Sequence, residues 1–142
     1  MTKSHATYTH ECTIRFDQAD PAGIMFFGQV FFLAHEAFEK FVISTGFSWE
    51  EWFANSKWGT PIRHSEANFQ RPMRPGKSYQ INVTVARLGE SSMTIRYVFM
   101  RDAHVHCEVQ IVHTFIDIKE ITKMPIPTEV RTRLAKFAET TK

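Results

Sequence analysis

The sequence predicts an α+β fold in which an antiparallel sheet of about five strands is wrapped around one long central helix. Several segments alternate apolar and polar residues with the period of a half-buried strand. Only one long segment, residues 29–45, is apolar over most of a helical circumference, so other structure must enclose it. The 142 residues are one domain's worth of chain. We expect a single domain over residues 1–142, with its core at about 8–118 and a C-terminal helix at about 127–139.

The first elements follow from local patterns. Residues 8–16 alternate and predict a strand with one buried face. The buried face should hold Tyr8, His10, Cys12, Ile14 and Phe16. The helix at 29–45 follows, and Gly46 is placed to end it. Ser48 and Glu51 form an S-x-x-E capping box, which predicts a short second helix.

The period then returns to two, which predicts the remaining strands. One strand should run from about 61 to 70, before the proline-rich turn "RPMRPGK". Three more should form a meander around residues 79–85, 93–99 and 105–115, because "LGES" and "RDAH" suit hairpin turns between them. Apolar residues return to helical spacing near the C-terminus, after Pro127.

Assembly and environment can be inferred from the same patterns. One sheet covers only one flank of the apolar helix, so we expect a second copy to complete the enclosure, in a homodimer or a homotetramer built as a dimer of dimers. A net charge of +2 without charged blocks argues against nucleic acid, and no apolar run is long enough for a membrane span. Two cysteines and no apolar leader lead us to expect a cytoplasmic protein.

Asp20 is the residue with two open interpretations. In "DPAG" it occupies the first position of a type I turn, and spacing alone favours a turn former. The same carboxylate precedes the start of a buried helix, where free N–H groups and a positive dipole end are concentrated. That environment suits a catalytic carboxylate as well.

Other polar residues have simpler explanations. Asp17 is expected to be a solvated strand-end residue. Glu36 is a rival base, although an i,i+4 pair with Lys40 would also explain it. His104 and His106 share a strand face without the further ligands of a metal site, and His113 is expected to be a satisfied core histidine. The sequence therefore predicts neither a metal nor an organic cofactor.

Two segments resemble a known family. "DQADPAGIMFF" is similar to the active-site loop of the 4-hydroxybenzoyl-CoA thioesterase group, and "GTPIRHSEANFQRP", residues 59–72, resembles the strand after its helix. The order of elements resembles that family's hotdog fold. The resemblance implies that Asp20 is the catalytic carboxylate and that the Phe27 backbone N–H polarises the thioester carbonyl.

The resemblance also implies substrate contacts. We expect these at five positions: Gly28, His35, Glu36, Thr60 and His64. The hydroxybenzoyl enzyme has an acidic residue where this chain has His35. Where some members have a basic cluster for the CoA phosphates, this chain has Gly-Glu-Ser at 89–91. Arg71, Arg74, Lys77 or Arg87 could supply that charge.

These features predict an acyl-CoA thioesterase, a thioester hydrolase that cleaves an aromatic or medium-chain acyl-CoA to free acid and CoA. The phenylalanines near the helix start, Phe26, Phe27, Phe31 and Phe32, would suit such acyl groups. An acyl-carrier-protein thioester is a second possible substrate. The alternatives on the same fold are an acyl-thioester hydratase or dehydratase, and a non-catalytic acyl-CoA-binding module.

Overall fold

The structure, a computed structural model, describes residues 4–140. Its elements follow one another in the predicted order, with two short helical turns and three two-residue strands in addition. They are β1 (Tyr8–Thr13), η1 (Phe16–Gln18), α1 (Gln29–Ser44), α2 (Trp49–Phe53), β2 (Trp58–Gly59), β3 (Ile62–Phe69), β4 (Ser78–Leu88), β5 (Ser92–Arg101), β6 (His104–Thr114), β7 (Ile116–Asp117), β8 (Thr122–Lys123), α3 (Thr128–Leu134) and η2 (Ala135–Phe137).

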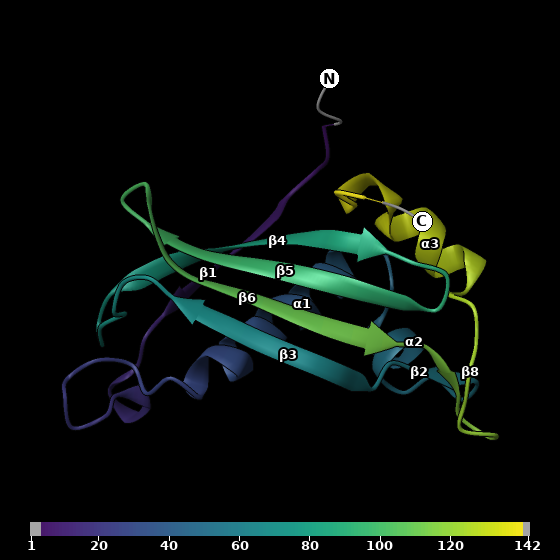
Figure 1. Cartoon of the computed structure of the whole chain (residues 1–142), viewed down its shortest axis with the longest axis horizontal. Coiled ribbons are helices and arrows are strands. Elements are labelled where there is room, and N and C mark those ends of the chain that lie inside the picture. Colours follow the sequence, from purple (N-terminus) through teal and green to yellow (C-terminus); the bar gives the residue numbers. More distant parts are fainter. Residues whose placement is uncertain (1–3, 141–142) are drawn as a thin grey trace.

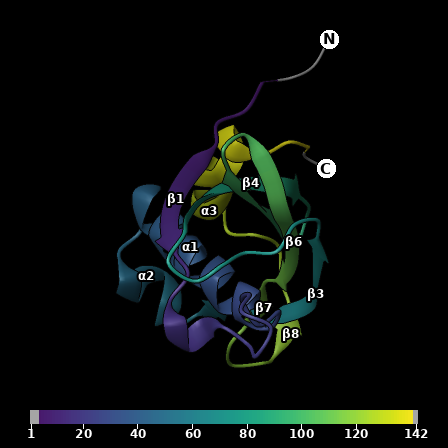
Figure 2. The same ribbon diagram turned by 90° about the vertical axis from the view of Figure 1, so that its left-hand side faces the viewer.

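The main sheet has five strands in the order β1-β4-β5-β6-β3, and all neighbours are antiparallel. Figure 1 shows the sheet in front of α1, with β3 at its lower edge. Seen end-on in Figure 2, the sheet curves around α1, while α2 lies on the side that the sheet leaves open. The predicted α+β fold, a curved antiparallel sheet around one long helix, is confirmed.

The core lies between α1 and the concave face of the sheet. Alternate residues of β4, β5 and β6 are buried there, as the period-two pattern predicts. Seven residues of α1 face them and are buried: Val30, Leu33, Ala34, Ala37, Phe38, Phe41 and Val42. Gly46 ends the helix with a φ of +107°, a left-handed conformation that glycine adopts without steric cost.

The first strand is shorter than predicted. It ends at Thr13, and Phe16 is 90% exposed instead of facing the core. The Arg15 backbone N–H donates to the side-chain oxygen of Gln18 at 2.8 Å, and this contact turns the chain into η1. A short helical turn therefore replaces the last residues of the predicted strand and rotates Phe16 outward.

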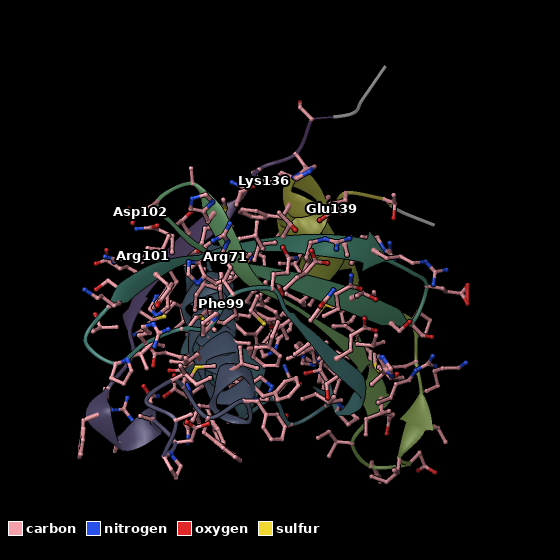
Figure 3. The ribbon with its side chains drawn as sticks, turned by 60° about the vertical axis from the view of Figure 1, so that its left-hand side comes forward. Arg71, Phe99, Arg101, Asp102, Lys136 and Glu139 are labelled. Atoms are coloured by element: carbon pink, nitrogen blue, oxygen red, sulfur yellow. The ribbon has the colours of Figure 1, made fainter. Side chains whose placement is uncertain are left out.

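The C-terminal segment runs alongside β4, where Ala138 forms a parallel bridge with Val85, and the Glu139 side chain reaches the convex face of the sheet. Glu139 (Figure 3) accepts hydrogen bonds from Thr84 of β4 at 2.6 Å and from the Arg96 guanidinium of β5 at 2.9 Å. Its backbone N–H also donates to the carbonyl of Val85. These contacts hold the end of the described chain against two central strands.

Two surfaces of the fold remain open. The edge strand β3 pairs only with β6, and all of its residues except Ala67 are exposed. On α1, Phe32 is 71% exposed, whereas most of the apolar circumference is buried by the sheet together with α2 and η2 of the same chain. Within residues 4–140, no helix is long and apolar enough to cross a membrane.

Candidate active site

Asp20 is a turn former in the structure. Its backbone carbonyl accepts a hydrogen bond from the Gly23 N–H at 2.9 Å, and its Oδ1 accepts one from the Ala22 N–H at 2.9 Å. Gly23 closes the turn at a φ of +79°. The D-P-A-G spacing therefore predicts the local backbone correctly, and these contacts fix the direction of the Asp20 side chain.

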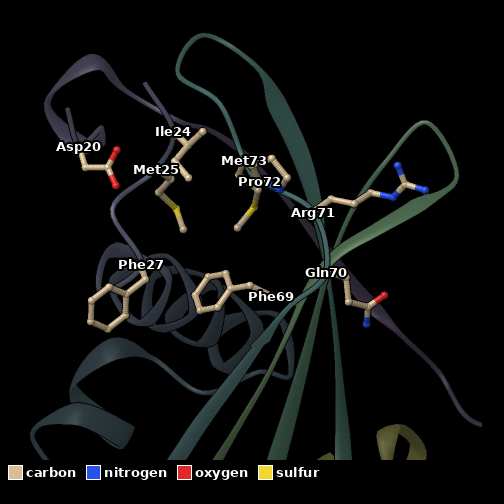
Figure 4. A pocket seen from close by; sticks show the side chains of 9 residues that line it. All are labelled: Asp20, Ile24, Met25, Phe27, Phe69, Gln70, Arg71, Pro72 and Met73. Atoms are coloured by element: carbon tan, nitrogen blue, oxygen red, sulfur yellow. The ribbon is translucent and has the colours of Figure 1, made fainter. Parts of the chain in front are cut away.

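Asp20 also lines a cavity of about 430 Å³. The cavity is bounded by the loop that enters α1 and by the segment that follows β3, and it is lined by Asp20, Ile24, Met25, Phe27, Phe69, Gln70, Arg71, Pro72 and Met73. In Figure 4 the Asp20 carboxylate points toward this space, while the Gln70 and Arg71 side chains point away from it. No hydrogen bond occupies Oδ2 of Asp20 within the described chain, so this oxygen can act on a bound molecule.

Phe27 lines the same cavity and has a free backbone donor. Its carbonyl accepts from Val30 at the first turn of α1, but its N–H has no acceptor among residues 4–140. Unpaired N–H groups at a helix start carry the positive end of the helix dipole. Gly28, the next residue, does not line the cavity, and a Cβ at this position would meet the Phe26 ring at 3.0 Å.

His35 and Thr60 lie together in a second cavity, of about 390 Å³. The lining comprises His35, Phe38, Glu39, Phe53, Thr60, Pro61, Ile62 and His113. His113 is buried, as predicted, but it is only half-satisfied: Nδ1 contacts the Thr60 carbonyl at 3.0 Å, while Nε2 has no partner in the described structure. The pKa of His113 is lowered to about 4, mainly by burial. Nearby His35 also lowers this pKa, while the contact with the Thr60 carbonyl raises it.

Two predicted substrate contacts lie elsewhere. Glu36 lines a third cavity on another side of α1, where its carboxylate is 2.8 Å from Nε2 of His10. Lys40 is not its partner in the described structure, so the i,i+4 pair that would also explain Glu36 is not formed. His64 lies on the convex side of β3 beside Glu66, at 2.9 Å, and lines none of the three cavities. The β-bulge between Ile62 and His64 explains this, because it shifts the facing of the residues that follow.

Several lining residues have no signal in the sequence alone. Phe69 and Met73 reach the first cavity only because β3 ends beside the Asp20 loop, where the Met25 N–H donates to the Met73 carbonyl at 2.7 Å.

At the hairpin after β4, the Arg131 guanidinium of α3 donates to the Gly89 carbonyl, and Arg87 lies nearby. The fold thus brings positive charge to a hairpin whose own sequence lacks it.

The described residues include no group of three His, Cys, Asp or Glu side chains placed to share a metal ion. His104 is exposed at the start of β6. Nδ1 of His106 lies 3.1 Å from the Pro72 carbonyl, and its ring packs edge-on against Tyr79. These two histidines therefore have structural or surface positions.

Comparison with known proteins agrees with this geometry. The thioesterase-like superfamily matches residues 14–134. A 1,4-dihydroxy-2-naphthoyl-CoA hydrolase of Nostoc punctiforme is 27% identical over 87% of this chain and 84% of its own length. Two solved structures share the fold: a 1,4-dihydroxy-2-naphthoyl-CoA thioesterase from Synechocystis (TM-score 0.84, 23% identity, 92% of this chain and 96% of that one) and a gentisyl-coenzyme A thioesterase (TM-score 0.80, 22% identity, 89% and 99%). The resemblance noted in the sequence is confirmed: the chain belongs to the thioesterase-like superfamily, as a thioester hydrolase with the hotdog fold.

Proposed function

We propose that the chain is one hotdog domain that hydrolyses an aromatic acyl-CoA thioester, with Asp20 as nucleophile or general base. The observation that carries the proposal is that a carboxylate oxygen of Asp20 and the Phe27 N–H, both without partners in the described chain, belong to residues lining one cavity. A thioesterase needs both groups at one carbonyl. In this proposal Asp20 both forms the turn and serves as the catalytic carboxylate, the two roles that the sequence leaves open.

The chemistry follows from these two groups. Asp20, or a water that it deprotonates, attacks the thioester carbon, and negative charge develops on the carbonyl oxygen. The Phe27 N–H, at the positive end of α1, is suited to stabilise that oxygen. When the tetrahedral intermediate collapses, the C–S bond breaks and CoA leaves as its thiol after taking up a proton. If Asp20 attacks directly, water then hydrolyses the resulting anhydride.

An aromatic acyl group fits the walls of the site. Phe27 and Phe69 line the Asp20 cavity, and Phe38 and Phe53 line the second one. The substrate named for the Nostoc relative, a dihydroxynaphthoyl thioester, supports a ring that bears hydroxyl groups. A medium-chain acyl group, or an acyl-carrier-protein thioester, would be a less favoured substrate of the same site.

We further propose that the site is completed in a homodimer, or in a tetramer of two such dimers. Among residues 4–140 the edge strand β3 has no partner on its outer side, and the two cavities lie at its opposite ends: Phe69 borders the first and Ile62 the second. If β3 of two copies pair antiparallel about a two-fold axis, the Asp20 cavity of one copy faces the second cavity of the other. Light scattering that showed a stable monomer at micromolar concentration would contradict this arrangement.

The decisive experiment is Asp20→Asn, assayed by thiol release from aromatic acyl-CoA substrates. The asparagine oxygen can still accept from the Ala22 N–H, so the turn should remain, but the amide has no comparable basicity. We expect kcat to fall by roughly a hundredfold or more, with folding and acyl-CoA binding close to wild type.

Two matched variants control for this experiment. Asp17→Asn removes a neighbouring exposed carboxylate that pairs with Arg15 at 3.0 Å, and it should leave kcat unchanged. Glu36→Gln tests the rival base in the third cavity and should matter less than Asp20→Asn. Near wild-type hydrolysis by Asp20→Asn, together with loss in Glu36→Gln, would move the catalytic carboxylate to α1. The same thiol-release assay separates hydrolysis from hydration of a double bond and from binding alone, since neither of these liberates CoA.

A further inference from the structure

His113 holds a hydrogen-bond acceptor in a defined orientation. Its ring stacks on Phe38, with centroids 4.9 Å apart and planes 15° from parallel, and the residue is 3% exposed. Nδ1 lies 3.0 Å from the Thr60 carbonyl oxygen. Because a carbonyl can only accept, Nδ1 carries the proton, and the neutral ring has its lone pair on Nε2.

This Nε2 is unused by the described protein. It is shielded from solvent and has no partner among residues 4–140, although the great majority of buried polar atoms are paired. Nε2 has therefore already lost its contact with water when the protein is folded. A donor that reaches Nε2 gains a hydrogen bond without a further desolvation cost on the protein side. His113 is among the residues that line the second cavity, so a donor bound there would reach Nε2 after a small displacement of the side chains that now cover this atom.

The cavity also restricts what kind of donor fits. Phe38, Phe53 and Ile62 supply apolar walls, which suit a flat ring. Burial lowers the pKa of both His35 and His113, so neither offers a cation to an anionic ligand at neutral pH. The Glu39 carboxylate in the same lining disfavours an anion further. A neutral aromatic ring with a hydroxyl group matches these walls.

We propose that His113 is a specificity-determining residue, whose Nε2 accepts a hydrogen bond from a ring hydroxyl of the acyl group, at a position remote from the thioester. The inference rests on the proposed thioesterase function and deepens it by naming the side chain that selects a hydroxylated ring. The cavity that receives the ring belongs to the copy opposite the attacking Asp20 in the proposed dimer. Thr60 has a positioning role, since its carbonyl fixes the tautomer of His113.

The test compares benzoyl-CoA with 3- and 4-hydroxybenzoyl-CoA. Wild type should favour at least one hydroxylated substrate by roughly tenfold or more in kcat/KM, the discrimination expected when a buried acceptor gains or lacks its donor. His113→Asn keeps a donor for the Thr60 carbonyl but removes the acceptor at Nε2. We expect the ratio of kcat/KM for the hydroxylated and unsubstituted substrates to fall to about one in this variant.

Matched variants exclude a merely structural effect. His106→Asn alters another histidine of β6 whose Nδ1 also contacts a backbone carbonyl, but outside this cavity, and it should keep the wild-type preference. His113→Gln places an amide oxygen near the position of Nε2 and should restore part of the preference for the hydroxylated substrate. Equal preference in wild type and His113→Asn, or no preference in wild type for either hydroxylated ring, would overturn the proposal whether or not the variants fold well.

A binding measurement separates this proposal from the proposed reaction. Titration calorimetry with the neutral probes benzamide, 3-hydroxybenzamide and 4-hydroxybenzamide should give the same order of preference in wild type and its loss in His113→Asn. If no thioester is hydrolysed but this pattern appears, the thioesterase proposal fails and the role of His113 stands. If hydrolysis occurs but neither assay discriminates the hydroxyl, the role of His113 is refuted and the thioesterase proposal stands.

Discussion

His113 should make the folded protein sensitive to mild acid. In the unfolded chain its pKa is the ordinary 6.5, whereas burial lowers it to about 4 in the folded protein. Between these two values the unfolded chain takes up a proton that the folded protein does not. Stability is therefore lost as the pH falls through this window. At about 1.4 kcal/mol for each pH unit between the two pKa values, the full effect is about 3 kcal/mol.

The assay is denaturant unfolding of wild type and His113→Asn at a series of pH values from 7 to 4. Trp52 of α2 and Trp58 of β2, which are both buried, report unfolding by fluorescence. Protein concentration must stay fixed, because association would also change the midpoint. Asparagine does not titrate, so wild type should lose about 3 kcal/mol more than the variant over this range. His106→Asn should follow wild type, and parallel losses in wild type and His113→Asn would refute the reasoning.

Three further predictions concern the fold. Burial raises the pKa of the Cys12 and Cys107 thiols to about 12, so neither should react with a thiol reagent at pH 8 until the protein is denatured, when both are titrated. Ser48→Ala removes the acceptor for the Glu51 N–H at 3.1 Å and should lower the free energy of unfolding by about 1 kcal/mol in denaturant titrations. Phe41→Ala opens a cavity in the middle of the buried face of α1 and should cost about 3–5 kcal/mol, measured in the same way.

The fold could be predicted because its main signals are local. The helix predicted at 29–45 is observed as Gln29–Ser44, and the meander strands follow their alternating residues, since periodicity depends only on neighbours in the chain. The prediction that Phe16 faces the core is wrong, because a single contact, from the Arg15 N–H to the Gln18 side chain, redirects the backbone. The sequence does not predict the small β2-β7-β8 sheet, because its two-residue strands are too short to show a period.

The site was only partly predictable for a similar reason. Asp20 and Phe27 belong to one short motif, and they line one cavity in the structure. Spacing along the helix offers Lys40 as a partner for Glu36, but the carboxylate contacts His10 of β1, 26 residues earlier. The second cavity joins α1, the residues before β3 and the end of β6, and no local pattern reports that His113 meets Thr60 across 53 residues.

The open outer side of β3 has a consequence for making this protein. An unpaired strand edge is a template for any other extended chain, and natural sheets commonly protect such edges with proline, lysine or a covering loop. In Ile62–Phe69 this protection is partial: Arg63 and Glu66 carry charge and a β-bulge follows Ile62, but there is no proline and no lysine, and both terminal residues are exposed and apolar. A newly synthesised chain would therefore be prone to aggregate until this edge is covered. Soluble yield should then depend on expression rate and temperature, and a substitution on β3 could reduce recovery of the protein even where it leaves the chemistry of Asp20 intact.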